Sequence, residues 1–171
     1  MAFDITPTDR RFSMDLTFKP ITKHDLEYIR VLRNRNRQHF LNNKVIGPAL
    51  HAKWYKKYRN NPLDVMFVVK DYHTNERLGV CAIYDLDMVA QTCKIGRFIV
   101  EHDMRGWGIG GAMVRFCTNF ALRVFKVKKA ILLEVKGKNE KAINLYKDNH
   151  FEIVSYHRGI AYMERKVEAD V

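Results

Sequence analysis

Three glycines stand at spacings that suit the binding of a phosphate group. The stretch "RGWGIGG" covers residues 105–111, and from Gly106 to Gly111 it has the pattern G-x-G-x-x-G. Glycine lets the backbone turn tightly, so that several N–H groups converge on an anion. A helix that begins near Gly110 would add the positive end of its dipole, and Arg105 would add a permanent charge. The loop is therefore predicted to bind a pyrophosphate.

The same pattern is typical of dinucleotide-binding folds, but its surroundings argue against such a site. Glu101 to Arg105 separate the preceding strand from the first glycine, whereas the dinucleotide motif opens almost directly from its strand. About sixty residues follow Gly111, which is too few for a second mononucleotide-binding half. No Gly-Lys-Ser/Thr sequence occurs, so a Walker loop is excluded. A different pyrophosphate ligand is favoured.

The elements that must position this loop form an α/β pattern. Apolar and β-branched runs predict strands at 16–21, 65–71, 77–86, 93–100, 130–135, 151–156 and 160–167. Helical periodicity predicts helices at 22–35, 49–60, about 110–126 and 139–149. The order β-α-α-β-β-β-α-β-α-β-β predicts an α/β domain with a mixed, mostly antiparallel central sheet.

Polar residues predict where two of the helices begin. Thr22 is expected to cap the first helix and Asn139 the last one, because their side-chain oxygens can accept from free backbone N–H groups. In the second helix, Leu50, Trp54 and Tyr58 recur at a spacing that predicts one apolar face.

Length and composition indicate one domain. The chain has 171 residues, 47% of them hydrophobic, which suffices for a single core over about residues 14–167. No apolar run approaches the length of a membrane span, and the first residues do not form a signal peptide. We therefore expect a cytoplasmic protein without a membrane partner.

The cysteines do not suggest metal or disulfide chemistry. Cys81, Cys93 and Cys117 are odd in number, lack a C-x-x-C spacing and stand apart from the histidines. Each lies in an apolar context and is predicted to be a small core residue. No metal site is expected.

The formal net charge of +11 predicts an anionic partner. Nucleic acid, a phosphorylated small molecule and an acidic cofactor all satisfy that expectation. The basic residues spread from Arg10 to Lys166 without a long tract or a nucleic-acid-binding motif, so nucleic acid is disfavoured.

Two stretches resemble the signatures of the GNAT acetyltransferase superfamily. Residues 105–110 match R/Q-x-x-G-x-G/A, and "NEKAINLYKDNHF" at 139–151 matches N-x-x-A-x-x-L-Y-x-x-x-G-F. His150 departs from the second pattern, where the family has glycine, and this changes a helix C-cap rather than the chemistry. The element order over about residues 14 to 167 is also similar. The resemblance implies a GNAT fold with a V-shaped split between the fourth and fifth strands.

The resemblance further implies acetyl-CoA as the acetyl donor. The backbone amide of Val100 would stabilise the oxyanion, and Tyr146 would protonate the departing thiolate. The alternative is that both residues are purely structural, with Tyr146 packing in the core and Asn139 acting only as a helix cap. The residues implied in binding acetyl-CoA are Phe98, Ile99, Val100, Arg105, Gly106, Trp107, Gly108, Ile109, Gly110, Gly111, Asn139 and Tyr146.

A general base must accept the proton of the attacking amine. Glu101 is the first candidate, because it stands just past the strand implied to bind acetyl-CoA. His102, Glu134 and a chain of water molecules are the alternatives.

The acceptor side is expected to involve the first two helices. Arg33 and Asn34, followed by His51 and Trp54, resemble a GNAT branch that acts on nucleotide-linked amino sugars and on N-termini of ribosomal proteins. Together with the positive charge, they favour direct attack by an amino group of a nucleotide-linked sugar. If the protein is an enzyme, the alternative acceptors are a protein N-terminus and a small amine. The non-enzymatic alternative is a catalytically inactive module that binds CoA, RNA or a partner protein. The assembly state stays open, with a homodimer as one option.

Overall fold

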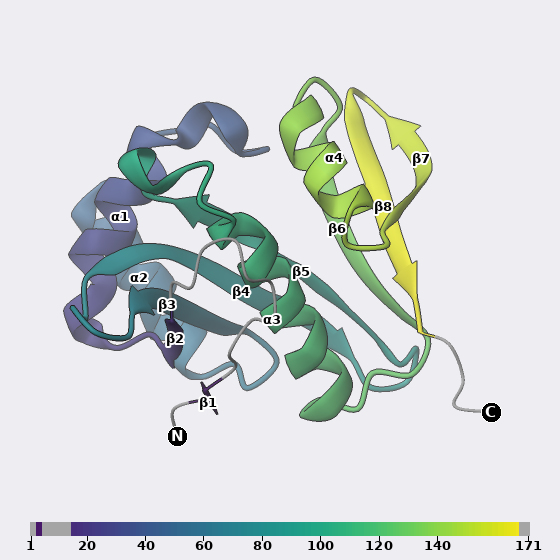
Figure 1. Ribbon diagram of the computed structural model, residues 1–171. Coiled ribbons are helices and arrows are strands. Elements are labelled where there is room, and N and C mark those ends of the chain that lie inside the picture. The colour runs from purple at the N-terminus through teal and green to yellow at the C-terminus, as the bar shows by residue number, and fades with distance from the viewer. Residues whose placement is uncertain (1–2, 5–14, 168–171) are drawn as a thin grey trace.

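The computed structural model describes residues 3–4 and 15–167, in which helices cover both faces of a twisted sheet (Figure 1). The helices are α1 (Leu26–Arg35), α2 (Pro48–Arg59), α3 (Ile109–Arg123) and α4 (Glu140–Lys147), with 3₁₀ turns η1 (Lys23–Asp25), η2 (Arg37–His39) and η3 (His102–Met104). The strands are β1 (Phe3–Asp4), β2 (Leu16–Pro20), β3 (Val65–Asp71), β4 (Arg77–Asp87), β5 (Thr92–Val100), β6 (Ala130–Lys136), β7 (Glu152–His157) and β8 (Ile160–Lys166).

The strands form one sheet in the order β1-β2-β3-β4-β5-β6-β8-β7. Within the described residues, β5 and β6 are the one parallel pair and every other neighbouring pair is antiparallel. The predicted element order and the mixed sheet are therefore confirmed. Strand β1 was not predicted, and it adds two residues at the edge beside β2.

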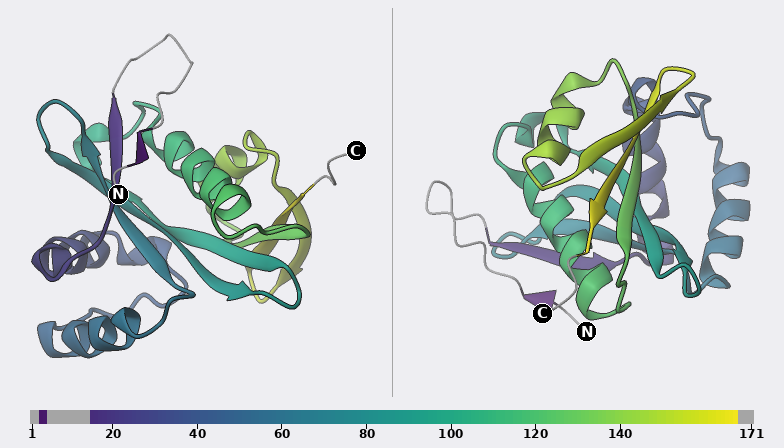
Figure 2. Two further views of the ribbon diagram at one scale, coloured as in Figure 1. Left: turned by 90° about the horizontal axis from the view of Figure 1, so that it is seen from below. Right: turned by 90° about the vertical axis from the view of Figure 1, so that its right-hand side faces the viewer.

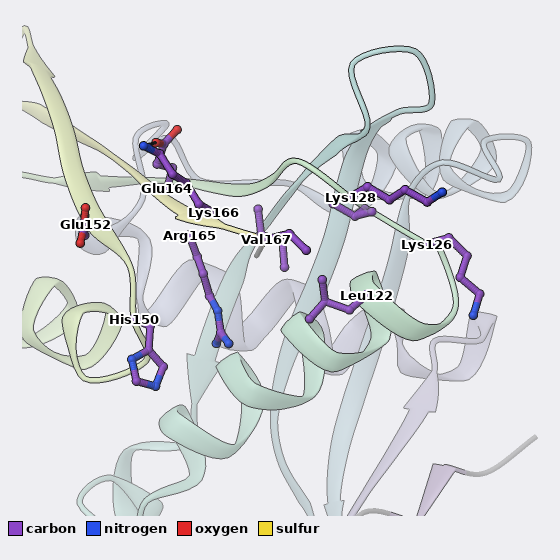
Figure 3. A pocket seen from close by; sticks show the side chains of 11 residues that line it. Leu122, Lys126, Lys128, His150, Glu152, Glu164, Arg165, Lys166 and Val167 are labelled. Atoms are coloured by element: carbon purple, nitrogen blue, oxygen red, sulfur yellow. Dashed lines mark ion pairs between the residues drawn. The ribbon is translucent and has the colours of Figure 1, made fainter. Parts of the chain in front are cut away.

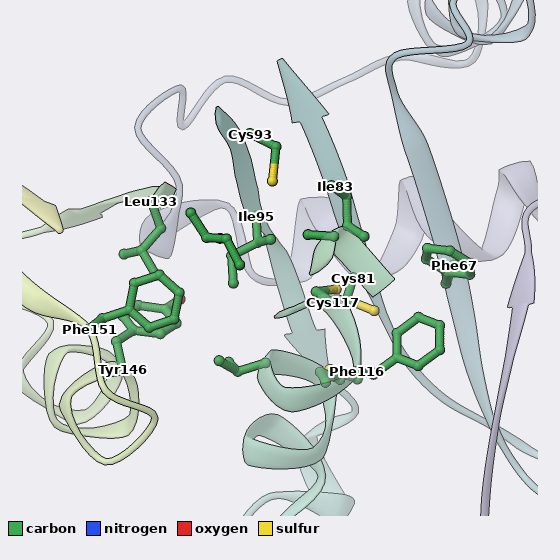
Figure 4. Close-up of a cluster of buried hydrophobic side chains, with 14 of the residues drawn as sticks. Phe67, Cys81, Ile83, Cys93, Ile95, Phe116, Cys117, Leu133, Tyr146 and Phe151 are labelled. Carbon is green, nitrogen blue, oxygen red and sulfur yellow. The ribbon is translucent and has the colours of Figure 1, made fainter. Parts of the chain in front are cut away.

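The two faces of the sheet carry different helices (Figure 2). On one face, α3 and α4 pack on the larger apolar cluster, part of which Figure 4 shows. Cys81, Cys93 and Cys117 are all buried in that cluster, as predicted. On the other face, Ile29 and Leu32 of α1 pack against the smaller cluster, which α2 also covers. Side chains of β5 that point to opposite faces therefore meet different helices.

The predicted helix caps are confirmed. Thr22 and Asp25 bond reciprocally before α1, with the Thr22 N–H donating to the Asp25 carboxylate at 2.9 Å. The Asn139 side chain accepts from the Ala142 N–H at 3.3 Å.

The predicted apolar face of α2 was partly wrong, because Leu50 is 60% exposed. His51 is buried in its place, and its ring stacks on that of Trp54 at 5.0 Å. The aromatic residues of α2 set the inward face, which is rotated by about one position from the predicted one.

Candidate active site

The parallel strands β5 and β6 separate after a short paired segment. Thr92, Cys93 and Lys94 pair with Ala130, Ile131 and Leu132, and no register joins the two strands beyond that point. Figure 1 shows the two strands diverging toward the ends from which α3 and α4 follow. The V-shaped split predicted between the fourth and fifth strands of the sequence is therefore present.

The N–H group of Val100 points into this split. The next residue, Glu101, donates its N–H to the Leu78 carbonyl of β4 at 2.9 Å. Successive N–H groups of a strand point to opposite sides in the plane of the sheet. The Val100 N–H therefore faces away from β4, which is the direction that the predicted oxyanion contact requires.

The register of β5 is broken by a bulge beside the split. Val80 pairs with Ile99 and Ala82 pairs with Gly96, so that Arg97 and Phe98 together oppose one residue of β4. Arg97 adopts the left-handed conformation, with φ of 54°. Gly96 directly precedes the bulge, and an isolated glycine in a strand is a signal for one, but the bulge was not predicted from the sequence.

The glycine loop has the backbone conformation that anion binding needs. Gly106 and Gly108 have φ of 87° and 78°, in the region that favours glycine. A Cβ atom at either position would meet nothing within 4 Å, so backbone conformation and not crowding selects glycine there. The buried Ile109 begins α3, whose first N–H groups face this loop. Trp107 is 48% exposed.

The next two glycines serve helix packing. A Cβ at Gly110 would lie 3.2 Å from the Leu145 side chain of α4, and one at Gly111 would lie 3.7 Å from the same side chain. The first turn of α3 therefore approaches α4 closely, at Leu145 in the last turn of that helix.

Residues 36–38 join both sides of the split. The exposed Arg105, which follows β5, donates to the side-chain oxygen of Asn36 at 2.5 Å. Lys136 ends β6 and donates to the Gln38 carbonyl at 2.7 Å. Asn36 and Gln38 belong to a polar, arginine-rich segment that the sequence indicates as part of the acceptor side, whereas Lys136 was not predicted and no local motif marks its contact.

Tyr146 lies in the wall of the split. Its ring centroid is 6.0 Å from that of Phe98 on β5 and 6.3 Å from that of Phe151. The side chain is buried, and this burial raises the pKa of Tyr146, with Tyr84 and Cys117 adding to the rise. The phenol is therefore protonated at neutral pH and able to donate a proton.

The three candidate bases have different surroundings. Burial and the carboxylate of Glu101 raise the pKa of Tyr28 on α1, which places Glu101 next to that hydroxyl. His102 is exposed and lies 3.1 Å from Asp103. Glu134 pairs with Lys94 at 2.7 Å, at the point where β5 and β6 separate. Because Glu134 is already paired with the Lys94 ammonium group, Glu101 stays the first candidate for the general base.

The predicted acceptor residues all lie in the α1–α2 layer. Arg33 donates to the carbonyls of Asn42 and Lys44, and its guanidinium lies 4.9 Å from the Phe40 ring centroid. The side chain of Asn34 both donates to and accepts from the backbone of Ile46, each at 2.9 Å. These two residues organise the connection between α1 and α2.

His51 and Trp54 lie beneath that connection. Burial lowers the pKa of His51, and nearby Arg30 lowers it further, so its imidazole is neutral at pH 7. Trp54 also stacks on Tyr58, with ring centroids 5.4 Å apart.

A cavity of about 1130 Å³ lies at the C-terminal end of α3, away from the split (Figure 3). Leu122, Arg165 and Val167 are among its lining residues, and no predicted site residue lines it.

Across residues 15–167, no three His, Cys, Asp or Glu side chains are grouped as a metal site would need. No helix in the described part of the chain has the length and apolar character to cross a membrane.

Comparison with known proteins identifies the family. The sequence model of the Acetyltransferase (GNAT) family matches residues 26–151. The chain belongs to the GNAT acetyltransferase family, and it is an N-acetyltransferase that uses acetyl-CoA. The resemblance seen in the two sequence signatures is thereby confirmed at the level of the family.

Solved structures share the fold at low sequence identity. Spermidine N-acetyltransferase from Vibrio cholerae, in complex with CoA and spermine, has a TM-score of 0.79 and 18% identity, covering 88% of this chain and 95% of that one. A domain from Methanocaldococcus jannaschii has a TM-score of 0.77 and 18% identity, covering 89% and 98%. No match was found among curated proteins. The similar structures do not favour the amino-sugar or ribosomal-protein branch that the sequence suggested.

The residues at the split fit CoA. The left-handed Gly106 and Gly108, the N-terminus of α3 and Arg105 suit a pyrophosphate, and the outward N–H of Val100 suits an extended amide chain. Acetyl-CoA supplies the acetyl group as a thioester.

Proposed function

We propose that this enzyme acetylates a primary amine on an anionic small molecule, with a nucleotide-linked amino sugar as the acceptor. One observation carries the proposal: residues 28–63, which include most of the α1–α2 layer, contain nine lysines and arginines and no aspartate or glutamate. Through Asn36 and Gln38 this layer contacts both sides of the split. An acceptor that approaches from the layer meets a positive field.

Cations from three separate segments lie close together at this place. Burial lowers the pKa of His39 on η2, and the charges of Arg105 and Lys136 lower it further. Burial and the charge of Arg37 likewise lower the pKa of Arg33. Such a concentration of like charge disfavours a polycationic acceptor and favours phosphate groups.

Apart from Glu101, the proposed base, three carboxylates of the α1–α2 layer and the split already have cationic partners. Glu27 binds Arg30 at 2.5 Å, Asp64 binds Arg97 at 2.7 Å and Glu134 binds Lys94 at 2.7 Å. These carboxylates offer little to the ammonium groups of a polyamine, because each already has a cationic partner. We therefore infer that spermine, present in the Vibrio cholerae complex, is a poor model for the acceptor here.

In the proposed mechanism the amine attacks the thioester directly in a ternary complex. The Val100 N–H donates to the carbonyl oxygen as it gains negative charge. Glu101, directly or through water, accepts the proton of the amine, and Tyr146 donates its phenolic proton to the departing sulfur. Asn139 caps α4 and so holds the helix that carries Tyr146.

Thiol release from acetyl-CoA tests the proposal with three acceptors. We expect turnover with a nucleotide-linked amino sugar, and at least tenfold lower kcat/KM with spermidine and with a peptide that has a free N-terminus. Preferred turnover of spermidine would contradict the anionic acceptor. Preferred turnover of the peptide would replace the small molecule with a protein N-terminus.

A further inference from the structure

Arg97 occupies a position where glycine would be the natural residue. In a bulge of this form, the first of the two unpaired residues adopts the left-handed conformation and is usually glycine. Arg97 has φ of 54°, so its own Cβ disfavours the conformation that the bulge requires. Strain of this kind persists only where surrounding contacts hold the residue, and it is frequent beside active sites.

Two contacts of the side chain hold Arg97 in place. Its guanidinium forms a bidentate pair with Asp64, with N–O distances of 2.7 and 2.8 Å. The Asp64 side chain is only 12% exposed, so water screens the pair weakly. The guanidinium also lies 4.6 Å from the ring centroid of Tyr84 on β4.

Asp64 is itself anchored near the start of β3. Its N–H donates to the Asn61 carbonyl at 3.3 Å, in the turn after α2. The Tyr58 hydroxyl accepts from the N–H of Met66 at 3.1 Å, two residues further on. The carboxylate that holds Arg97 therefore belongs to a turn tied to both α2 and the sheet.

The bulge sets the orientation of the last residues of β5. Phe98 is its second residue, and its ring lies 6.0 Å from Tyr146. Without the extra residue, every position from Phe98 onward would exchange faces, and the N–H groups would exchange between β4 and the split. The position of the Val100 N–H thus depends on the conformation of Arg97.

We propose that Arg97 is a positioning residue, which Asp64 and Tyr84 lock in the left-handed conformation to aim the Val100 N–H at the acetyl carbonyl. This proposal rests on the oxyanion role proposed above for Val100. It requires the side chain of Arg97, and not only a backbone that tolerates the left-handed conformation.

The substitution Arg97→Gly separates these two requirements. Glycine adopts the same backbone conformation without strain, so the variant is expected to fold, but it lacks the contacts with Asp64 and Tyr84. Asp64→Asn removes the charge of the partner alone. Arg165→Gln, which removes a half-buried arginine from β8, serves as the matched control.

Infrared spectroscopy of acetyl-CoA labelled with ¹³C at the carbonyl measures the hydrogen bond between the Val100 N–H and the acetyl carbonyl directly. The measurement needs no acceptor. We expect the bound carbonyl stretch of the wild type and of Arg165→Gln to lie below its value in free solution. In Arg97→Gly and Asp64→Asn we expect most of that shift to disappear and kcat to fall about tenfold or more, with the Kd for CoA within about threefold. Arg97→Lys should restore part of the shift.

The outcomes separate the two proposals. A full carbonyl shift in Arg97→Gly would overturn the role of Arg97 and leave that of Val100 intact. Absence of a shift in the wild type would overturn the proposed role of Val100, and the role of Arg97 with it.

Discussion

The ring of Tyr146 on α4 lies 6.0 Å from the ring of Phe98 on β5, centroid to centroid, with an angle of 46° between the planes. The two residues come from opposite sides of the split, where β5 and β6 no longer pair. Because Phe98 belongs to the bulge, the same irregularity of β5 that directs the Val100 N–H also sets the surroundings of Tyr146.

Replacement of Tyr146 by Phe should separate chemistry from packing. The ring contacts remain, so the free energy of unfolding should change by about 1 kcal/mol or less. Loss of the proton donor should lower kcat by about 100-fold or more, with little change in KM. Steady-state kinetics and thermal unfolding of the same preparation measure both. Undiminished kcat would exclude Tyr146 as the general acid.

The left-handed glycines of the loop can be compared with one elsewhere in the chain. Gly108→Ala and Gly159→Ala both place a Cβ in open space at φ of 78° and 76°. Each should lose about 1 to 2 kcal/mol of stability through the backbone alone. Only Gly108→Ala should also weaken CoA binding, by about tenfold, as titration calorimetry would measure. Equal CoA affinity in both variants would contradict the proposed phosphate loop.

Charge reversal at Arg37 should impair acceptor binding selectively. Arg37→Glu replaces an exposed cation on η2 and should raise KM for the nucleotide-linked acceptor about fivefold, given the modest strength of exposed charge interactions. The KM for acetyl-CoA should be unchanged. Lys128→Glu, an equally exposed reversal before β6, is the control. Equal effects of the two reversals would indicate a nonspecific influence of net charge.

The buried His51 should make the fold sensitive to acid. Burial holds its pKa below the value of 6.5 expected in the unfolded chain, so the unfolded state binds more protons as the pH falls below 6.5. Stability contributed by neutral His51 is therefore lost progressively below that pH. Urea unfolding between pH 7 and pH 5 should show a smaller decrease for His51→Gln than for the wild type. Parallel decreases would contradict the assignment.

His39 should act in the same direction, because burial and the charges of Arg105 and Lys136 lower its pKa as well. The double variant with His39→Gln and His51→Gln should therefore show the smallest loss of stability between pH 7 and pH 5. A double variant as acid-sensitive as the wild type would exclude both histidines as the cause.

Local patterns were enough to predict most of the fold. The apolar run at 93–100 became β5 at Thr92–Val100, and the caps Thr22 and Asn139 were found where their residue types indicated. Strand β1 was missed because its two residues carry no pattern of their own and depend on pairing with β2.

The donor and acceptor sides of the site differed in how far the sequence could predict them. The glycine loop and α4 are continuous motifs, and their backbone conformation follows from residue type. The pair of Arg97 with Asp64 spans 33 positions, and the contact of Lys136 with Gln38 spans 98. Such contacts arise only when the sheet is assembled, so no local pattern predicts them.

The most direct test of the proposed acceptor class compares one amino sugar with and without its nucleotide. Both compounds present the same amine, so any difference in kcat/KM for acetyl transfer comes from the diphosphate and the nucleoside. We predict a preference of at least tenfold for the nucleotide-linked form, which decreases as salt screens the positive field. Equal kcat/KM for the two compounds, or a preference for the free sugar, would contradict an anionic acceptor.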